Sequence, residues 1–129
     1  MIQRFIELGE GYGDIFELCE ITERNNDRVI HLLSLTTRLN NRKVVSLVTV
    51  LEPTGEGKFQ PLYICREGIP HKDEVLGRRY ELFQETANRL NKKMIELEVR
   101  PSTSFAEKEL YYQYLIGILR MNRFIPALS

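Results

Sequence analysis

The chain has few of the residues that build metal, redox or disulfide sites. Among its 129 residues there are two cysteines, two histidines and no tryptophan. Cys19 and Cys65 lie within apolar patterns and neither belongs to a C-x-x-C pair, so we expect two small buried hydrophobic side chains in a reducing compartment. His31 lies in a strand pattern and His71 in a loop, and neither has further ligands at a metal-binding spacing. The sequence therefore predicts no metal site, no catalytic residue and no cofactor.

The chain also lacks a long apolar run, a signal peptide and an excess of charge. No segment approaches the ~20 apolar residues that span a bilayer, and Met1–Glu7 mixes charged residues into the position of a signal-peptide core. A cytoplasmic protein without a membrane segment is therefore expected. Eighteen basic residues balance eighteen acidic ones, which argues against a general nucleic-acid-binding domain. Six of the acids stand within residues 1–23 beside a single base, Arg4, so the remainder of the chain has a positive balance.

What the chain does have is a regular succession of strand and helix patterns. With 43% hydrophobic residues it is long enough for one domain, residues 1–129, with a core of its own. Strands are predicted at residues 1–8, 28–38, 43–51, 60–66 and 94–100, and helices at residues 14–24, 73–91 and 105–121. The order β-α-β-β-β-α-β-α predicts an α/β (α+β) fold, in which helices cover a five-stranded mixed sheet with a central antiparallel meander.

Three local signals make this prediction specific. Asn40-Asn41 separates two strand patterns, and because asparagine tolerates positive φ we expect a tight hairpin turn there. The arm that follows, residues 43–51, is apolar on both faces, which is typical of a central strand covered by helices. Ser104-Phe105-Ala106-Glu107 has the form of a capping box, so the last helix is predicted to begin at Phe105. That helix is the most apolar one, and we expect it to be largely enclosed.

Two glycine-rich segments fail as phosphate-binding loops. The segment Gly9–Gly13 follows the first strand, but the third glycine of G-x-G-x-x-G would fall on Asp14. Its acidic residues also place negative charge where a phosphate would sit. The segment Thr54–Lys58 lacks the first glycine and the hydroxyl of a P-loop and leads into a strand instead of a helix.

Two groups of side chains remain as candidate binding surfaces. A candidate anion patch flanks the connection into the second predicted helix and consists of Arg66, Lys72, Arg78 and Arg79. The simpler interpretation of these bases is a solvated surface near a helix end. On the last helix, Tyr112, Ile116 and Arg120 share one side, and if that side is exposed it forms a small apolar interface suited to dimerisation.

The element order over residues 14–100 resembles the restriction-endonuclease-like fold, whose core is a helix, a three-strand meander, a helix and a strand. That resemblance implies an acidic residue on the second meander strand and an acid-x-lysine motif on the third. The third strand here is Gln60-Pro61-Leu62-Tyr63-Ile64-Cys65-Arg66, which has neither an acid nor a lysine. Without converging carboxylates there is nothing to hold Mg²⁺ for phosphodiester hydrolysis.

Residues 1–12 and the run Glu107–Arg120, with the sequence EKELYYQYLIGILR, look like a small family of uncharacterised proteins from Bacillus-type bacteria. That resemblance covers the whole chain and implies no activity. Two hypotheses remain. The preferred one is a non-catalytic domain that acts through protein association, as a homodimer formed by the last helix or an exposed sheet edge. The alternative is a nuclease-related protein, or one that binds an anion or nucleic acid, with a degenerate restriction-endonuclease-like core.

Overall fold

The structure is a computed structural model that describes residues 2–9, 13–73 and 77–126. Within these ranges the chain forms the predicted succession of strands and helices, with two short 3-10 turns, η1 and η2. Their bounds are β1 Gln3–Glu7, α1 Gly13–Arg24, η1 Asn26–Arg28, β2 Val29–Leu39, β3 Arg42–Leu51, β4 Gln60–Pro70, α2 Arg78–Arg89, β5 Met94–Glu98, η2 Ser102–Ser104 and α3 Lys108–Met121. The predicted α+β fold is therefore confirmed.

The five strands form one mixed sheet in the order β1-β4-β3-β2-β5. Strands β2, β3 and β4 are the predicted antiparallel meander. Strand β1 pairs with β4 in parallel, and β5 pairs with β2 in parallel, so β3 alone runs against the other four described strands. The prediction of a central β3 is confirmed, and β5 lies at one edge of the sheet.

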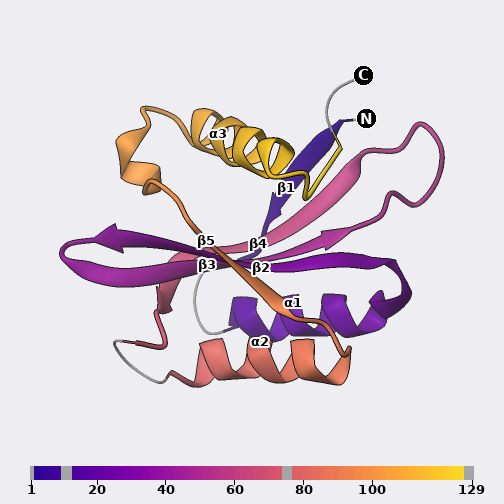
Figure 1. Cartoon of the computed structure of the whole chain (residues 1–129), viewed down its shortest axis with the longest axis horizontal. Helices are drawn as coiled ribbons and strands as arrows, with labels where there is room; N and C mark the ends of the chain where they lie inside the picture. Colours follow the sequence, from indigo (N-terminus) through magenta and orange to yellow (C-terminus); the bar gives the residue numbers. More distant parts are fainter. Residues whose placement is uncertain (1, 10–12, 74–76, 127–129) are drawn as a thin grey trace.

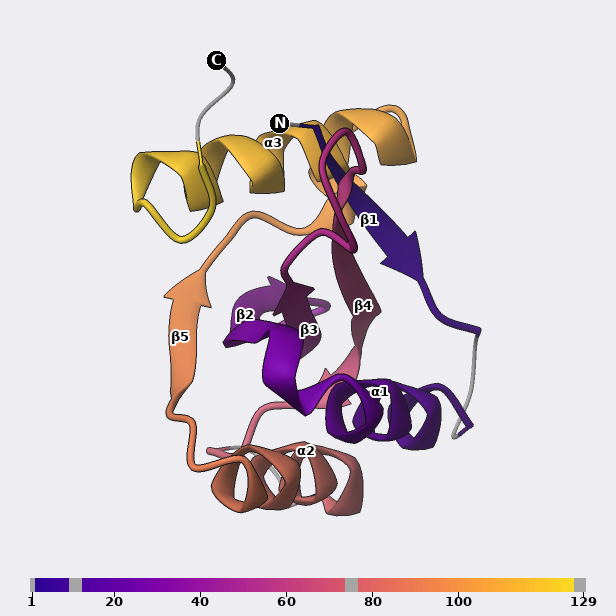
Figure 2. The ribbon, with the colours of Figure 1, turned by 90° about the vertical axis from the view of Figure 1, so that its right-hand side faces the viewer.

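The helices form one layer on each face of the sheet. Figures 1 and 2 show α1 and α2 together on one face and α3 alone on the other. The first layer packs on Val45 and Leu47 of β3, and the second packs Tyr111 and Leu115 of α3 on Val48 of the same strand. Both faces of β3 are thus covered, as its double-sided apolar pattern predicts.

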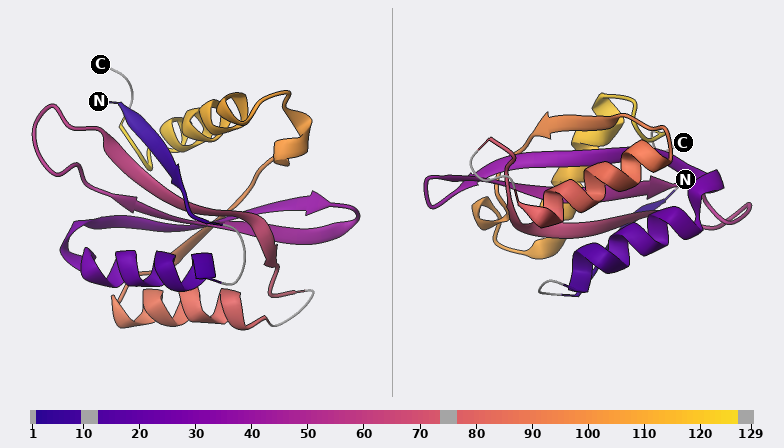
Figure 3. Two further views of the ribbon diagram at one scale, coloured as in Figure 1. Left: turned by 180° about the vertical axis from the view of Figure 1, so that it is seen from behind. Right: turned by 90° about the horizontal axis from the view of Figure 1, so that it is seen from below.

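All three helices begin at the same edge of the sheet. We call this the carboxyl edge, because β1, β4, β2 and β5 end there; it lies on the left of Figure 1. Figure 3 shows from below that α1 and α2 lie side by side and run back across the sheet from that edge. The carboxyl edge therefore combines helix N-termini, which carry partial positive charge, with the polar residues that follow strand ends.

The hairpin between β2 and β3 turns at Asn40 and Asn41, which have φ of 51° and 64°. Two consecutive positive φ values are the requirement of a type I′ turn, whose twist matches that of the flanking strands. The prediction from the Asn-Asn pair is confirmed.

The start of α3 differs from the prediction. Ser102–Ser104 forms the 3-10 turn η2, and the helix begins at Lys108, after Glu107 in an extended N-cap conformation. Ser104 stands three residues before the N-cap position of Glu107, and its N–H closes the 3-10 turn on the carbonyl oxygen of Pro101. The capping-box prediction is therefore wrong.

The enclosure of α3 is also less complete than predicted. Leu110 is 46% exposed and Met121 is 84% exposed, whereas Tyr111, Leu115 and Leu119 are buried. One stripe of the helix packs on the sheet, and the opposite stripe faces solvent although it is apolar. None of the helices in the described ranges is long and apolar enough to cross a membrane.

Strand β4 extends further than predicted, to Pro70 instead of Arg66. Its register with β3 shifts between Val45 and Leu47, and Glu67 at this irregularity has φ of 28°. A bulge of this kind lets a strand continue past residues that look like a loop. Helix α2 begins at Arg78, and the predicted first turn of that helix includes residues 74–76, which lie outside the described residues.

Candidate functional site

A pocket of about 680 Å³ opens at the carboxyl edge beside β1 and β4. We call it the carboxyl-edge pocket. Open α/β sheets commonly bind ligands just outside the carboxyl ends of their strands, so its position makes it the candidate site. Its lining comes from β1, β4, all three helices or their approaches, and η2: Glu7, Leu8, Gly9, Asp14, Arg66, Glu67, Gly68, Arg79, Ser102 and Lys108.

The bulge in β4 positions one wall of this pocket. The N–H of Glu67 donates to the hydroxyl oxygen of Ser46 at 2.8 Å, which compensates for the interrupted strand pairing. The carboxylate of Glu67 then accepts two hydrogen bonds from Ser102, one from its N–H at 2.6 Å and one from its hydroxyl at 2.9 Å. This contact fixes η2, and with it the path into α3, to the end of β4.

A second carboxylate links three elements across the pocket. Glu7, at the end of β1, lies 3.2 Å from Nε of Arg66 on β4 and 3.1 Å from Nζ of Lys108 at the start of α3. Partial burial favours the neutral acid, but the hydrogen bond from Lys108 and the charge of Arg66 hold the pKa of Glu7 below its usual value. Glu7 is therefore ionised at neutral pH and neutralises part of the basic lining.

Two tyrosine hydroxyls lie close to these carboxylates. The hydroxyls of Tyr111 and Tyr112 are buried, and neither makes a hydrogen bond of normal geometry with the described residues. Burial raises the pKa of both phenols, and the charges of Glu67 near Tyr111 and of Glu7 near Tyr112 raise it further. Both hydroxyls are therefore protonated at neutral pH.

The remaining polar lining comes from the first turns of α1 and α2. Arg79 donates through Nη2 to the carbonyl oxygen of Gly68 at 2.7 Å. Oδ1 of Asp14 is buried and has no hydrogen-bond partner within the described ranges. Below it, the thiol of Cys65 donates to the backbone oxygen of Asp14 at 3.3 Å, and burial raises the pKa of this thiol. The pocket thus combines basic side chains with an acceptor that lacks a donor.

The structure divides the predicted anion patch. Arg66 and Arg79 meet in the carboxyl-edge pocket, but Lys72 pairs with Glu96 at 3.1 Å beside a separate cavity of about 190 Å³. Arg78 lies 3.3 Å from Glu85 and faces along the exposed side of α2. The prediction grouped these four bases because they are close in the sequence, but the structure places them at three separate sites.

Sequence reasoning missed five polar residues of the pocket. Lys108 and Glu7 are 101 residues apart, and Ser102 and Glu67 are 35 residues apart. The available signal was positional, since each of Glu7 and Glu67 stands at or near the end of a strand and Asp14 stands in the first turn of a helix. That signal becomes specific only when the order of strands in the sheet is known.

The predicted interface on α3 is occupied within the domain. The ring of Tyr112 stacks on Phe5 of β1 with centroids 4.9 Å apart, and Ile116 packs in the same cluster. The guanidinium of Arg120 donates from Nε to Oε1 of Gln3 at 3.1 Å. This side of α3 therefore faces β1 and is not the exposed patch that the hypothesis required. Self-association of the domain is a separate question, and it stays a prediction.

Comparison with known proteins places the chain in a family without an assigned function. No curated protein and no solved structure matches it. Residues 1–125 match one protein family along nearly the whole chain. The expected membership of an uncharacterised family is thereby confirmed: the chain belongs to the family described as "Domain of unknown function (DUF7147)".

Proposed function

We propose that this domain is a non-catalytic binding protein that holds a small zwitterion, a molecule with both an ammonium and a carboxylate group, in the carboxyl-edge pocket. One observation carries the proposal. The pocket brings the unpartnered Oδ1 of Asp14 together with the guanidinium groups of Arg66 and Arg79. A volume of about 680 Å³ leaves ample room for an amino acid or a small peptide.

The basic side of the pocket suits a carboxylate. A guanidinium has five N–H donors in a planar fork that matches carboxylate oxygens two at a time. Arg66 directs Nε to Glu7, and Arg79 directs one Nη2 bond to Gly68, so protein contacts orient both groups. The nearby start of α2 adds a favourable dipole for negative charge.

The acidic side suits an ammonium. A buried carboxylate oxygen without a donor costs about 1–3 kcal/mol, and a ligand ammonium in contact with Oδ1 of Asp14 removes that cost. Glu7 and Glu67 already accept hydrogen bonds from Lys108 and from Ser102. Asp14 is therefore the carboxylate that we assign to the ligand.

Binding without covalent chemistry agrees with the state of the reactive groups near the pocket. The Ser102 hydroxyl donates a hydrogen bond to Glu67. Burial keeps the thiol of Cys65 and the hydroxyls of Tyr111 and Tyr112 protonated. A nuclease-related role has less support, because β4, Gln60–Pro70, contains no acid-x-lysine motif. A mixture of acids and bases in the lining also disfavours a polyanion such as nucleic acid.

The test is calorimetric titration of the full chain with the common amino acids at constant ionic strength. For each amino acid that binds, the matching amine without its carboxylate and the matching acid without its ammonium are titrated as well. We expect both single-charge analogues to bind at least about tenfold more weakly, because each forfeits one charged hydrogen-bonded contact.

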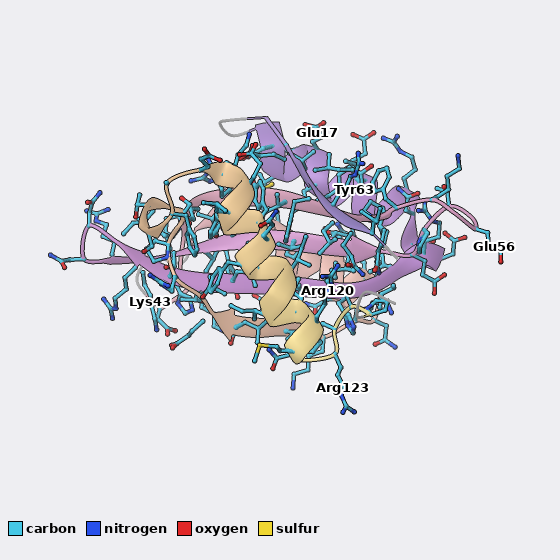
Figure 4. The ribbon with its side chains drawn as sticks, turned by 90° about the horizontal axis from the view of Figure 1, so that it is seen from above. Glu17, Lys43, Glu56, Tyr63, Arg120 and Arg123 are labelled. Carbon is cyan, nitrogen blue, oxygen red and sulfur yellow. The ribbon has the colours of Figure 1, made fainter. Side chains whose placement is uncertain are left out.

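Two variants and one matched control localise the site. Asp14→Asn and Arg79→Gln should each weaken binding by about tenfold or more, whereas Glu17→Gln should leave it unchanged. Glu17 lies on α1 as Asp14 does but is exposed and lines no part of the pocket; Figure 4 labels it. Equal binding of the acid analogue, or an equal loss in Glu17→Gln, would overturn the zwitterion assignment, and so would an absence of binding by every amino acid.

A further inference from the structure

A second pocket, of about 520 Å³, lies at the opposite end of α3. We call it the amino-edge pocket, because it lies where β2 and β4 begin. Its described lining contains two arginines and a histidine but no acidic residue: Ile30, His31, Gln60, Arg120, Arg123, Phe124, Ile125 and Pro126. This charge balance differs from that of the carboxyl-edge pocket, whose three described bases face three acids.

A neutral network orients Arg120 in this pocket. Its guanidinium donates from Nε and Nη2 to Oε1 of Gln3, a side chain on β1 that is only 5% exposed. Nε2 of Gln3 donates in turn to the backbone oxygen of Pro126 at 3.0 Å and to Oε1 of Gln60 at 3.2 Å. An amide fixes the direction of a guanidinium without cancelling its charge, so Arg120 keeps its full attraction for an anion.

Arg123 lies at the mouth of the pocket, in a strained backbone conformation. Its φ is 61°, and its N–H bonds the carbonyl oxygen of Arg120 while the N–H of Phe124 bonds that of Leu119. Helices usually place glycine at this left-handed position, and another residue there costs about 1–2 kcal/mol. Figure 4 shows Arg123 extending from the C-terminal end of α3, on a different side from Arg120. Retained strain at a basic residue is a reason to ask for a function.

An aromatic pair forms one wall of the site. The rings of His31 and Phe124 meet edge to face with centroids 5.3 Å apart. Partial burial, and then the charge of Lys92 in the connection between α2 and β5, lower the pKa of His31. Lys92, Arg120 and Arg123 make no ion pair with any residue of the described ranges. The lowered pKa favours a neutral imidazole at pH 7.

Compensation of the α3 dipole explains only part of this arrangement. Bases in the last turn of a helix commonly offset its negative end. That effect does not require the buried amide of Gln3 that orients Arg120. It also gives no reason for arginine at the left-handed position of residue 123.

We propose that the amino-edge pocket is a second binding site, which takes an oxyanion such as the phosphate or carboxylate group of a small molecule. It is distinct from the zwitterion site, since the 14 residues of α3 separate the two by roughly 20 Å. Arg120 binds the oxygens, Arg123 adds positive charge at the mouth of the pocket, and the edge of the His31–Phe124 pair contacts the body of the ligand.

The two histidines of the chain provide the readout. His31 lies in the amino-edge pocket, and His71 lies in the connection after β4 at the carboxyl edge, so the two imidazoles give separate signals in a proton NMR experiment. The probes are inorganic phosphate and acetate, each added at constant ionic strength against sodium chloride. We expect bound anion to raise the pKa of His31 by about one unit, and the signals of His71 should not respond to either anion. The anion that gives the larger change in the pKa of His31 shows whether the site prefers a phosphate or a carboxylate.

Variants test the assignment to Arg123. Arg123→Gln should raise the dissociation constant of the anion, obtained from the His31 shifts, by about three- to tenfold. Arg42→Gln should leave this constant unchanged. Arg42 is an exposed base at the start of β3, outside the pocket. No response of His31 to either anion overturns the proposal, as does an equal response of His71 or an equal effect of Arg42→Gln. None of these results bears on amino-acid binding at the carboxyl edge, so the two proposals fail independently.

Discussion

Glu67 and Ser102 join the central sheet to the layer of α3 through two hydrogen bonds on one carboxylate. The N–H of Ser102 lies 2.6 Å from Oε1 and its hydroxyl lies 2.9 Å from Oε2. The carboxylate reaches η2 because the bulge at Glu67, with φ of 28°, redirects β4 at this point. The junction therefore depends on an irregularity in the strand, and the carboxyl-edge pocket depends on the junction.

This contact predicts unequal roles for two serines in the same 3-10 turn. Ser102→Ala should lower the free energy of unfolding by about 1–2 kcal/mol, because a charge-assisted hydrogen bond is lost and the carboxylate of Glu67 keeps a single donor. Ser104→Ala is the matched control and should change it by less than about 0.5 kcal/mol, since Ser104 is exposed and caps no helix. Urea unfolding at pH 7 measures both values. The reverse order would restore the capping-box interpretation of Ser104.

Two tyrosines on α3 should respond in opposite ways to loss of the hydroxyl. Tyr111 is fully buried and its hydroxyl lacks a hydrogen bond within the described ranges, so Tyr111→Phe should leave the free energy of unfolding unchanged or raise it by up to about 1 kcal/mol. The hydroxyl of Tyr114 accepts the N–H of Arg100 at 3.0 Å, so Tyr114→Phe should lower it by about 1 kcal/mol. Urea unfolding of the pair decides the point. A loss larger for Tyr111→Phe than for Tyr114→Phe would mean that its hydroxyl has a partner.

The hairpin between β2 and β3 offers a stabilising change. Asn41 has φ of 64°, a conformation that glycine adopts without steric cost, and Asn-Gly is the preferred pair for a type I′ turn. Asn41→Gly should raise the midpoint of thermal unfolding, and Asn41→Ala should lower the free energy of unfolding by about 1 kcal/mol. Differential scanning calorimetry of both variants tests this. If alanine were tolerated as well as glycine, the turn would not need positive φ at this position.

The order of elements, the hairpin and the central strand could be predicted from the sequence, since each depends on local periodicity or on one dipeptide. The end of β4 could not be predicted, because Glu67-Gly68 has the composition of a loop. In the structure the N–H of Glu67 donates to the hydroxyl of Ser46 on the neighbouring strand, and β4 continues. The start of α3 was also misplaced. Ser104 and Glu107 satisfy the capping-box spacing, but the chain must first leave the sheet through η2.

The candidate site was harder to predict than the fold. Arg66 and Arg79 were two of the four bases in the predicted anion patch, and both line the pocket. The partner of Arg66, Glu7, comes from β1, and no local pattern specifies the parallel pairing of β1 with β4. The side of α3 with Tyr112 was predicted to form an interface on the condition that it is exposed. Strand β1, through Phe5 and Gln3, covers that side instead.

The network around Glu7 predicts a specific dependence of stability on pH. The pKa of Glu7 is lower in the folded domain than in the unfolded chain, so its contribution is complete above the unfolded value, about 4.3. The contribution disappears as the pH falls through the lower folded value, where both states are protonated. Glu7→Gln should therefore cost about 1 kcal/mol at neutral pH, from the weakened contacts with Arg66 and Lys108, and this difference from wild type should vanish in acid.

Urea unfolding of wild type and Glu7→Gln between about pH 3 and pH 7 gives this difference directly. Glu56→Gln is the control, since Glu56 is exposed in the loop before β4 and forms no ion pair among the described residues, and its difference from wild type should stay near zero throughout. A gap between wild type and Glu7→Gln that widens toward acid would mean that the folded pKa of Glu7 is raised. Burial would then outweigh the hydrogen bond from Lys108 and the charge of Arg66, and these bases would not stabilise the Glu7 carboxylate. The pH dependence of one carboxylate thus tests the charge balance on which the assignment of a zwitterion rests.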